Sequence, residues 1–350
     1  RFKCDWSSDV CSSDLDATTG GNDPTKSGDA GNGFLMRQGY TILLGGWDIS
    51  AAPGNGRLTI RVPVAVNKDG SPIVGPSMEE FVVDDNQTIT GPLTYAAATL
   101  DKSKASLAVR VRTEDAPTMI PADKWAYTDD KGAAIKLLPD GTKFEAGMLY
   151  EFVYQAKNPL VAGLGFAAIR DVGAFFKSAK ADDAGTPNPL AAAGGMRWAI
   201  SRGSSQSGNF LRGFLHLGFN EDETGKPVHD GAWPMIAGRR IGMNFRWAQP
   251  DGVLELYQAG SEGPQWWVPW PDIVRGLPAR GILDRCTASK TCPKIFEHFG
   301  SAEVWGLKLT PEWVGTAADA DIPLPPNVRR YYLPGTTQDR KSTRLNSSHT

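Results

Sequence analysis

The stretch Arg197–Arg212 (RWAISRGSSQSGNFLR) contains the residues whose types and spacing point most directly to chemistry. A short apolar run, a Gly/Ser cluster and a helical pattern follow one another, which predicts a strand, a tight turn and a helix. Such a turn presents a serine hydroxyl at the end of a strand, and it needs small residues two positions before and after the serine. Ser205, flanked by Gly203 and Ser207, is the predicted nucleophile. An ordinary Gly/Ser loop is the alternative, because Ser207 stands where the strict Gly-x-Ser-x-Gly pattern has its second glycine.

A hydroxyl nucleophile that attacks a carbonyl also needs two donors for the oxyanion that forms. We expect the first donor to be the backbone N–H of Gln206, the residue after the nucleophile. The second would be the N–H of Trp47, because the paired glycines Gly45–Gly46 let the backbone turn closely after an apolar run. The alternative is that these glycines only end a strand.

The base that activates the serine must in turn be oriented by an acid. Glu303 follows the predicted strand 294–299 and is the expected acid. Asp319 and Asp321 lie in a later loop and compete for this role. Glu303 is also explained by ordinary solvation in a loop, so that alternative stays open.

No histidine of the chain is expected to reach Ser205. His216 lies eleven residues further along the predicted helix, roughly 16 Å away at 1.5 Å per residue. His229 precedes the next strand, at the opposite edge of the sheet. His298 lies inside a strand, five residues before the acid and so about 16 Å from the edge at ~3.3 Å per residue. His349 belongs to residues 339–350, which resemble a translated sequencing adapter.

The elements that must position these residues alternate between strands and helices. The predicted strands are 39–47, 148–154, 198–200, 233–237, 294–299 and 328–333, with helices over 164–179 and after residue 208. This alternation predicts an α/β fold, a mostly parallel sheet with helices on both faces. Active sites of parallel sheets lie at the carboxyl ends of the strands, so the candidate residues are expected to meet at one edge of the sheet.

The domain organisation follows from changes in composition. Residues 1–15 and 339–350 resemble translated sequencing adapters and are expected to be foreign, so the native protein is expected to be truncated at both ends. The remaining predicted segments are 16–56 (first strand and oxyanion loop), 57–145 (a β-rich insertion with Asp-Gly and Gly-Pro turns) and 146–338 (the α/β core, with an aromatic cap at about 250–292 that contains Trp266, Trp267 and Trp270).

Composition excludes several classes of partner. The chain has 350 residues, is 41% hydrophobic and carries a net charge of −2, so no nucleic-acid partner is expected. No apolar run reaches the roughly 18 residues of a membrane span. Cys286 and Cys292 can close a small disulfide loop or remain reduced, and only His298 lies near enough to extend them into a zinc site. Neither a metal nor a cofactor is expected, and the oligomeric state is left open.

Several motifs resemble those of a known family, the α/β-hydrolase domain-containing proteins of environmental bacteria. The motifs are Gly39-Tyr-Thr with Gly46-Trp47, Gly163–Asp171, Gly203–Gly208, Asp230-Gly231, Ala237–Arg240, Cys292–Phe296 with Gly300–Glu303, and Val328–Tyr332. The tight turn over Gly203–Gly208 also resembles the nucleophile turn of tannases and feruloyl esterases, which supports Ser205. The resemblance implies an α/β-hydrolase fold and a secreted or periplasmic carboxylic-ester hydrolase. Members of the family continue Gly-Thr-Thr into His-Gly, whereas this sequence has Gln338 after Thr337.

Two hypotheses follow. The first is a serine esterase that acts on a small ester through an acyl-enzyme, with the histidine lost after Thr337, so that the chain as it stands is expected to be inactive. The second is a non-catalytic protein on the same scaffold, in which the aromatic cap and the β-rich insertion bind a hydrophobic or carbohydrate ligand.

Overall fold

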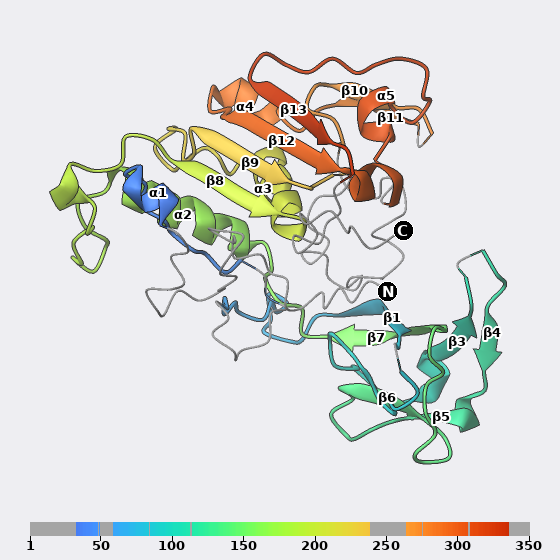
Figure 1. Cartoon of the computed structure of the whole chain (residues 1–350). Helices are drawn as coiled ribbons and strands as arrows, with labels where there is room; N and C mark the ends of the chain where they lie inside the picture. The colour runs from blue at the N-terminus through green and yellow to red at the C-terminus, as the bar shows by residue number, and fades with distance from the viewer. Residues whose placement is uncertain are drawn as a thin grey trace. The chain divides into compact units, whose positions relative to one another are not determined.

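The computed structural model of the chain describes residues 33–47, 49, 59–83, 85–112, 114–238, 264–274, 276–306 and 309–335 (Figure 1). The chain divides into two compact units. The α/β unit combines Arg1–Ile60, Gly163–Gly242 and Ala259–Thr350, and the β-rich unit combines Arg61–Ala162 and Met243–Gln258. The predicted nucleophile, acid and oxyanion residues all belong to the α/β unit.

A four-stranded parallel sheet forms the centre of the α/β unit. Its strands, in spatial order, are β13 (Val328–Leu333), β12 (Lys294–Gly300), β9 (Gly231–Met235) and β8 (Ile200–Ser204). Ser204 of β8 lies opposite Met235 of β9, which lies opposite His298 of β12. The carboxyl ends of these strands therefore meet at one edge, where parallel sheets carry their chemistry.

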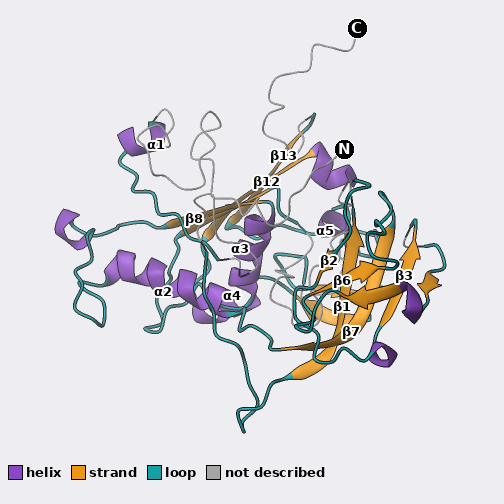
Figure 2. Cartoon of the chain, turned by 90° about the horizontal axis from the view of Figure 1, so that it is seen from below, coloured by secondary structure: helices purple, strands orange, loops and turns teal. Residues whose placement is uncertain are grey.

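The three longest helices of the described residues are α2 (Leu164–Ser178), α3 (Gln206–His216) and α4 (Asp284–Ser289). They lie on the same side of the sheet (Figure 2). Phe166 of α2 stacks on Phe210 of α3 with ring centroids 4.6 Å apart. The apolar positions of α3, spaced three and four residues apart, are buried: Phe210, Leu211, Phe214 and Leu215. Of the predicted helices on both faces of the sheet, these three confirm the cover of one face.

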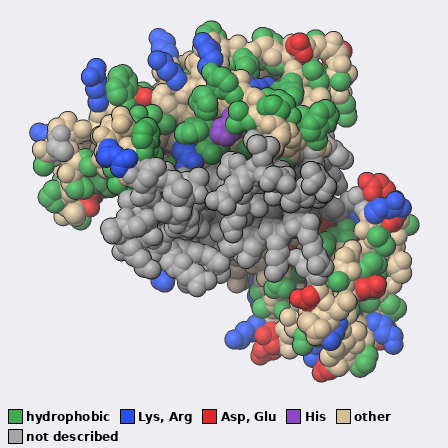
Figure 3. All heavy atoms as spheres, in the orientation of Figure 1, with side chains coloured by type: hydrophobic (Ala, Val, Ile, Leu, Met, Phe, Trp, Pro, Cys, Tyr) green, Lys and Arg blue, Asp and Glu red, His purple; other side chains and the backbone are tan. Residues whose placement is uncertain are grey.

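The other face of the sheet carries large side chains that are partly exposed. Ile200, Phe296 and Tyr331 are 57%, 42% and 48% exposed. The guanidinium of Arg202 lies over the ring of Trp233, 5.2 Å from its centroid. Hydrophobic side chains gather over this part of the α/β unit in Figure 3, with Lys and Arg side chains beside them.

The strand predicted over residues 39–47 is wrong. Residues 40–47 form no strand and follow the short helix α1 (Phe34–Arg37). Tyr40 and Leu43 are about half exposed. A continuous apolar run predicts a strand covered on both faces, but these side chains are not covered. Trp47, at the end of the run, is buried.

The β-rich unit contains two antiparallel sheets. The four-stranded sheet has the order β1 (Val74–Val82), β7 (Leu149–Lys157), β3 (Ser106–Arg110) and β4 (Thr118–Ile120). The three-stranded sheet has the order β2 (Gly91–Pro92), β6 (Ala134–Leu137) and β5 (Trp125–Tyr127). Fully buried side chains from both sheets form one core, among them Leu107, Trp125, Ile135 and Phe152.

The boundary predicted at residue 145 lies too early, because β7 belongs to the β-rich unit and not to the α/β core. It pairs antiparallel with β1 and β3. Its side chains alternate, with Phe152 and Tyr154 buried while Val153 between them is 43% exposed. This period of two is typical of a sheet covered on one face, which is the antiparallel arrangement. The β-rich unit accordingly extends to Ala162.

The described part of the predicted cap is a hairpin and a disulfide-bonded loop. β10 (Trp270–Asp272) pairs antiparallel with β11 (Leu277–Arg280). Trp266 and Trp267 are each only 2% exposed, so they are core residues rather than an exposed aromatic platform. Residues 250–263 of the cap lie outside the described residues, and for them the cap stays a prediction.

A disulfide joins Cys286 of α4 to Cys292, just before β12, which decides between the two states left open by the sequence. The remaining helices are short: α5 (Pro311–Val314), the 3-10 turns η2 (Lys102–Lys104), η3 (Ala122–Lys124) and η4 (Ala191–Ala193), and the π-helical turn η6 (Ala302–Gly306). None of the described helices is long and apolar enough to cross a lipid bilayer.

Candidate active site

Ser205 occupies the turn between β8 and α3 in a backbone conformation that side-chain-bearing residues rarely adopt. Its φ is 54° and its ψ is −117°. The N–H of Ser205 donates to the carbonyl oxygen of Met235 at 2.9 Å, and its own carbonyl accepts from the N–H of Asn209 at 2.9 Å. These bonds fasten the turn to β9 on one side and to α3 on the other. The predicted order of strand, turn and helix is therefore confirmed, with Ser205 in the strained position.

Two glycines allow the chain to turn this tightly. A Cβ atom added at Gly203 would lie 2.2 Å from the carbonyl oxygen of Ser207, and one at Gly208 would lie 2.5 Å from Cβ of Ala237. The sequence predicted close approaches two residues before and after Ser205. The structure has the close approach before Ser205 at Gly203, as predicted, but the one after it lies at Gly208 and not at position 207. Position 207 therefore has room for a serine side chain.

We expect Gly203→Ala to lower the free energy of unfolding by about 3 kcal/mol, because the added methyl group would overlap the backbone of the turn. Urea denaturation measures the change. Gly163→Ala is the control, since a Cβ at Gly163 would meet no atom within 4 Å and the change should stay below about 1 kcal/mol. Equal denaturation midpoints for the two variants would contradict the close approach.

Glu303 lies in η6, directly after β12, and its side chain is fully buried. Oε2 accepts a hydrogen bond from the N–H of Gly300 at 2.6 Å, while Oε1 is buried with no hydrogen-bond partner among the described residues. Burial raises the pKa of this carboxyl, and the Gly300 N–H partly offsets that effect. Asp319 and Asp321 are exposed. Of the three candidate acids, Glu303 is the one that presents a buried oxygen in need of a donor.

Trp47 reaches the beginning of α3. Its indole is 3% exposed, donates from Nε1 to Oγ of Ser207 at 3.0 Å, and stacks on Phe210 with centroids 4.6 Å apart. The Gly45–Trp47 loop is thereby held against the helix that begins at Gln206. The first N–H groups of a helix have no partner within the helix, so such a helix start favours anions.

Two of the described histidines lie in α3 and β12. His216 is the last residue of α3, and burial lowers its pKa. The predicted distance of about 16 Å from the edge to His298 is wrong, because β12 ends only two residues later, at Gly300. Its Nδ1 accepts a hydrogen bond from Nε1 of Trp233 at 3.1 Å. His298 is therefore close to the edge, with one ring nitrogen engaged by a neighbouring strand.

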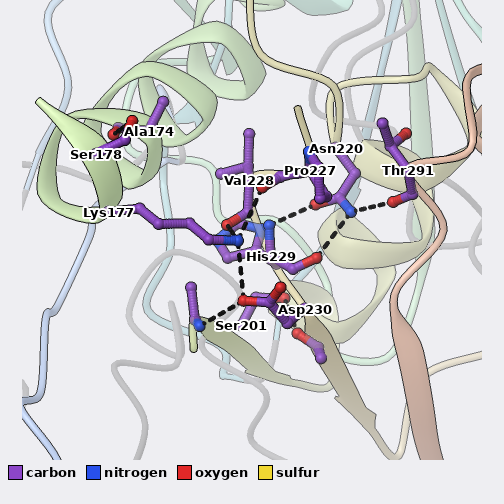
Figure 4. A network of polar contacts seen from close by, with 12 residues as sticks. Ala174, Lys177, Ser178, Ser201, Asn220, Pro227, Val228, His229, Asp230 and Thr291 are labelled. Atoms are coloured by element: carbon purple, nitrogen blue, oxygen red, sulfur yellow. Dashed lines mark hydrogen bonds and ion pairs between the residues drawn. The ribbon is translucent and has the colours of Figure 1, made fainter. Parts of the chain in front are cut away.

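His229 lies just before β9, at the amino ends of the strands, as predicted (Figure 4). Its N–H donates to Oδ1 of Asn220 at 2.9 Å, and its carbonyl accepts from Nδ2 of the same side chain at 3.0 Å. Asn220 also donates to the carbonyl of Thr291 at 2.6 Å. Lys177 of α2 pairs with Asp230 at 2.9 Å beside it. These contacts hold His229 as a structural residue at the edge opposite Ser205.

The imidazole of His229 predicts a loss of stability in acid. Burial, followed by the nearby Lys177 charge, lowers its pKa from 6.5 to about 4, and Asp230 acts in the opposite direction. The unfolded chain therefore binds a proton that the folded chain does not, so stability is complete above pH 6.5 and falls between pH 6.5 and pH 4. The total is about 3 kcal/mol at 1.36 kcal/mol per unit.

Urea denaturation at several pH values tests this, with His229→Gln as the comparison. We expect the variant to be less stable than the parent at pH 7.5 but to lose less stability on acidification. Parallel pH profiles for the two chains would show that His229 does not contribute.

A buried ion cluster behind the site was missed by sequence reasoning. Arg212 of α3 bonds to Glu297 at 2.8 Å and to Glu312 at 3.0 Å, and all three side chains are fully buried. Glu297 also accepts from Arg330 at 2.7 Å and from the indole of Trp267 at 3.0 Å. The available signal was that Arg212 lies four residues after Gly208 and three before Leu215, which puts it on the apolar face of the helix.

Among the described residues, no group of three or more His, Cys, Asp or Glu side chains is placed to hold a metal ion. The chemistry that the described edge offers is that of a serine hydroxyl, a buried carboxyl and the N–H groups at the start of α3. This set is suited to acyl transfer.

Comparison with known proteins agrees with this arrangement. The profile of a family described as an alpha/beta hydrolase domain matches residues 91–345. This span contains all four strands of the parallel sheet, together with Ser205 and Glu303. No curated protein and no solved structure shows a significant match to the chain. Since the profile covers well over half of the chain, the protein belongs to the alpha/beta hydrolase family.

Proposed function

We propose that this hydrolase is a serine carboxylic-ester hydrolase that acts on a small ester, with Ser205 as its nucleophile. The observation that carries the proposal is the strained conformation of Ser205 between β8 and α3. A conformation of this kind has a cost of roughly 1–3 kcal/mol and is retained mainly where function needs it. The buried carboxyl of Glu303, at the end of the strand next but one, supports the same reaction.

In the proposed reaction Oγ of Ser205 attacks the ester carbonyl while a base removes its proton. The oxyanion is held by the backbone N–H groups of Gln206 and Trp47. Collapse of the tetrahedral intermediate breaks the bond to the alcohol oxygen, which leaves with the proton from the base. Water then attacks the acyl-enzyme by the same route, releasing the carboxylic acid and restoring Ser205.

We assign the base to a histidine placed after β13 rather than to one of the described histidines. His216 lies at the far end of α3, His229 lies at the opposite edge of the sheet, and Nδ1 of His298 is engaged by Trp233. The order nucleophile, acid, histidine requires a position after the strand that follows the acid. Position 338, which is glutamine in this sequence, fits that order.

The test is to place His-Gly after Thr337 through Gln338→His with Asp339→Gly, and to measure p-nitrophenyl acetate and butyrate hydrolysis beside the unchanged chain. A correctly placed general base should raise kcat/KM by about 10²-fold or more. No hydrolysis of either ester by the variant would contradict the esterase proposal. Equal activity of the two chains would contradict the position of the base.

The Cys286–Cys292 disulfide supports action in an oxidising compartment, such as the periplasm or the cell exterior. Of the two hypotheses from the sequence, ligand binding by an aromatic platform has lost the support of Trp266 and Trp267. Their indoles donate to Pro311 and Glu297 inside the α/β unit.

A further inference from the structure

The side chain at position 207 has a contact that a glycine would lack. The oxygen of Ser207 accepts the indole N–H of Trp47 at 3.0 Å, and Ser207 itself is only 6% exposed. A buried indole N–H without an acceptor destabilises the fold. The hydrogen bond to Ser207 therefore favours one position of the Trp47 ring. Because the close approaches of the turn fall on Gly203 and Gly208, position 207 is free to carry a hydroxyl.

The same indole belongs to a stack of aromatic rings that includes Phe210 and Phe166. Trp47 stacks on Phe210 and Phe210 stacks on Phe166, each with centroids 4.6 Å apart and interplanar angles of 25° and 9°. These rings come from the Gly45–Trp47 loop, α3 and α2. The stack limits movement of Trp47 perpendicular to the rings, and the hydrogen bond to Ser207 limits sliding within their plane.

We propose that Ser207 is a positioning residue that fixes the Gly45–Trp47 loop against the start of α3, and with it the second oxyanion donor. Ser207 directly follows Gln206, whose N–H is the first donor under the proposed function, on which this inference rests. One hydroxyl thus sets the spacing between the two donors. Ser207 stands where the Gly-x-Ser-x-Gly pattern has its second glycine, and on this proposal its hydroxyl has a function.

The test compares Ser207→Ala, Trp47→Phe and the double variant in the chain that carries Gln338→His and Asp339→Gly. Trp47→Phe keeps a ring against Phe210 but removes the N–H. Each single variant should lower kcat about tenfold, less than the 10²–10³-fold expected for complete loss of an oxyanion donor. KM and the pH profile should not move, because the substitutions act on the oxyanion donor and leave the base unchanged. The double variant should be no slower than the slower single variant.

Amide hydrogen exchange at Gly46 and Trp47 gives a readout that does not need activity. Ser207→Ala should speed exchange at both amides, with no change at the β-rich unit as the internal control. Unchanged exchange at Gly46 and Trp47 would contradict the claim that Ser207 fixes the loop. Faster exchange with unchanged kcat, or additive losses in the double variant, would overturn its catalytic role. An inactive parent chain would overturn the proposed function instead, and exchange would still decide whether Ser207 anchors the loop.

Discussion

Ser205→Ala, introduced into the chain that carries Gln338→His and Asp339→Gly, should lower kcat/KM for p-nitrophenyl acetate by at least about 10³-fold. Under the proposed function, the substitution removes Oγ of Ser205, the atom that forms the acyl-enzyme, and leaves the other groups of the site in place. An independent readout is covalent labelling by a p-nitrophenyl phosphonate. Oγ of Ser205 would displace p-nitrophenolate and form a stable phosphonate ester, which adds a fixed mass to the peptide that contains residue 205.

Ser204→Ala is the matched control, because Ser204 is the buried last residue of β8, directly before Ser205, and the same kind of substitution removes its hydroxyl. The control should retain most of the activity and should label normally. Full activity of Ser205→Ala, or phosphonate found on Ser204 or Ser207, would show that the nucleophile has been assigned to the wrong residue.

Arg212→Met should lower the free energy of unfolding by about 3–5 kcal/mol, the cost typical of removing one partner from a buried ion pair. Methionine has a similar length but leaves Glu297 and Glu312 buried without their shared cation. The guanidinium also lies 4.8 Å from the ring centroid of Trp267, so its removal loosens that side chain as well. Urea denaturation measures the loss.

Arg170→Met is the control for Arg212→Met. Arg170 lies in the same unit and pairs with Asp171 and Glu223, but near the surface, with 21% of its side chain exposed. Its removal should cost less than about 1 kcal/mol. Similar losses for the two variants would mean that the buried cluster contributes no more than a surface pair.

The parts of the fold that local sequence determines were predictable. The turn at Ser205 follows from the small residues around it and the helical spacing behind it, and both are visible within a dozen residues of chain. β12 and β13 were predicted nearly to their ends because they are short apolar runs bounded by turn residues. The disulfide was left open, since spacing alone permits it without requiring it.

The predictions that were wrong, and the contacts that were missed, depend on residues that are distant in the sequence. β7 looks like a core strand of the α/β sheet until its neighbours, β1 and β3, are known. The distance of His298 from the edge depended on where β12 ends and on its register with β9, neither of which is fixed by the spacing to Glu303. The contact of Trp47 with Ser207 joins residues 160 positions apart, so no local pattern reveals it.

The four charged side chains of the buried cluster, Arg212, Glu297, Glu312 and Arg330, come from separate places in the chain: α3, β12, α5 and β13. Their charges balance only as a complete set, since two arginines face two glutamates. When genes of this family are recombined, crossovers between residues 212 and 330 would join halves of the set from different parents. Functional chimeras should therefore be recovered mainly when this whole block is inherited from one parent, or when both parents carry the same four residues.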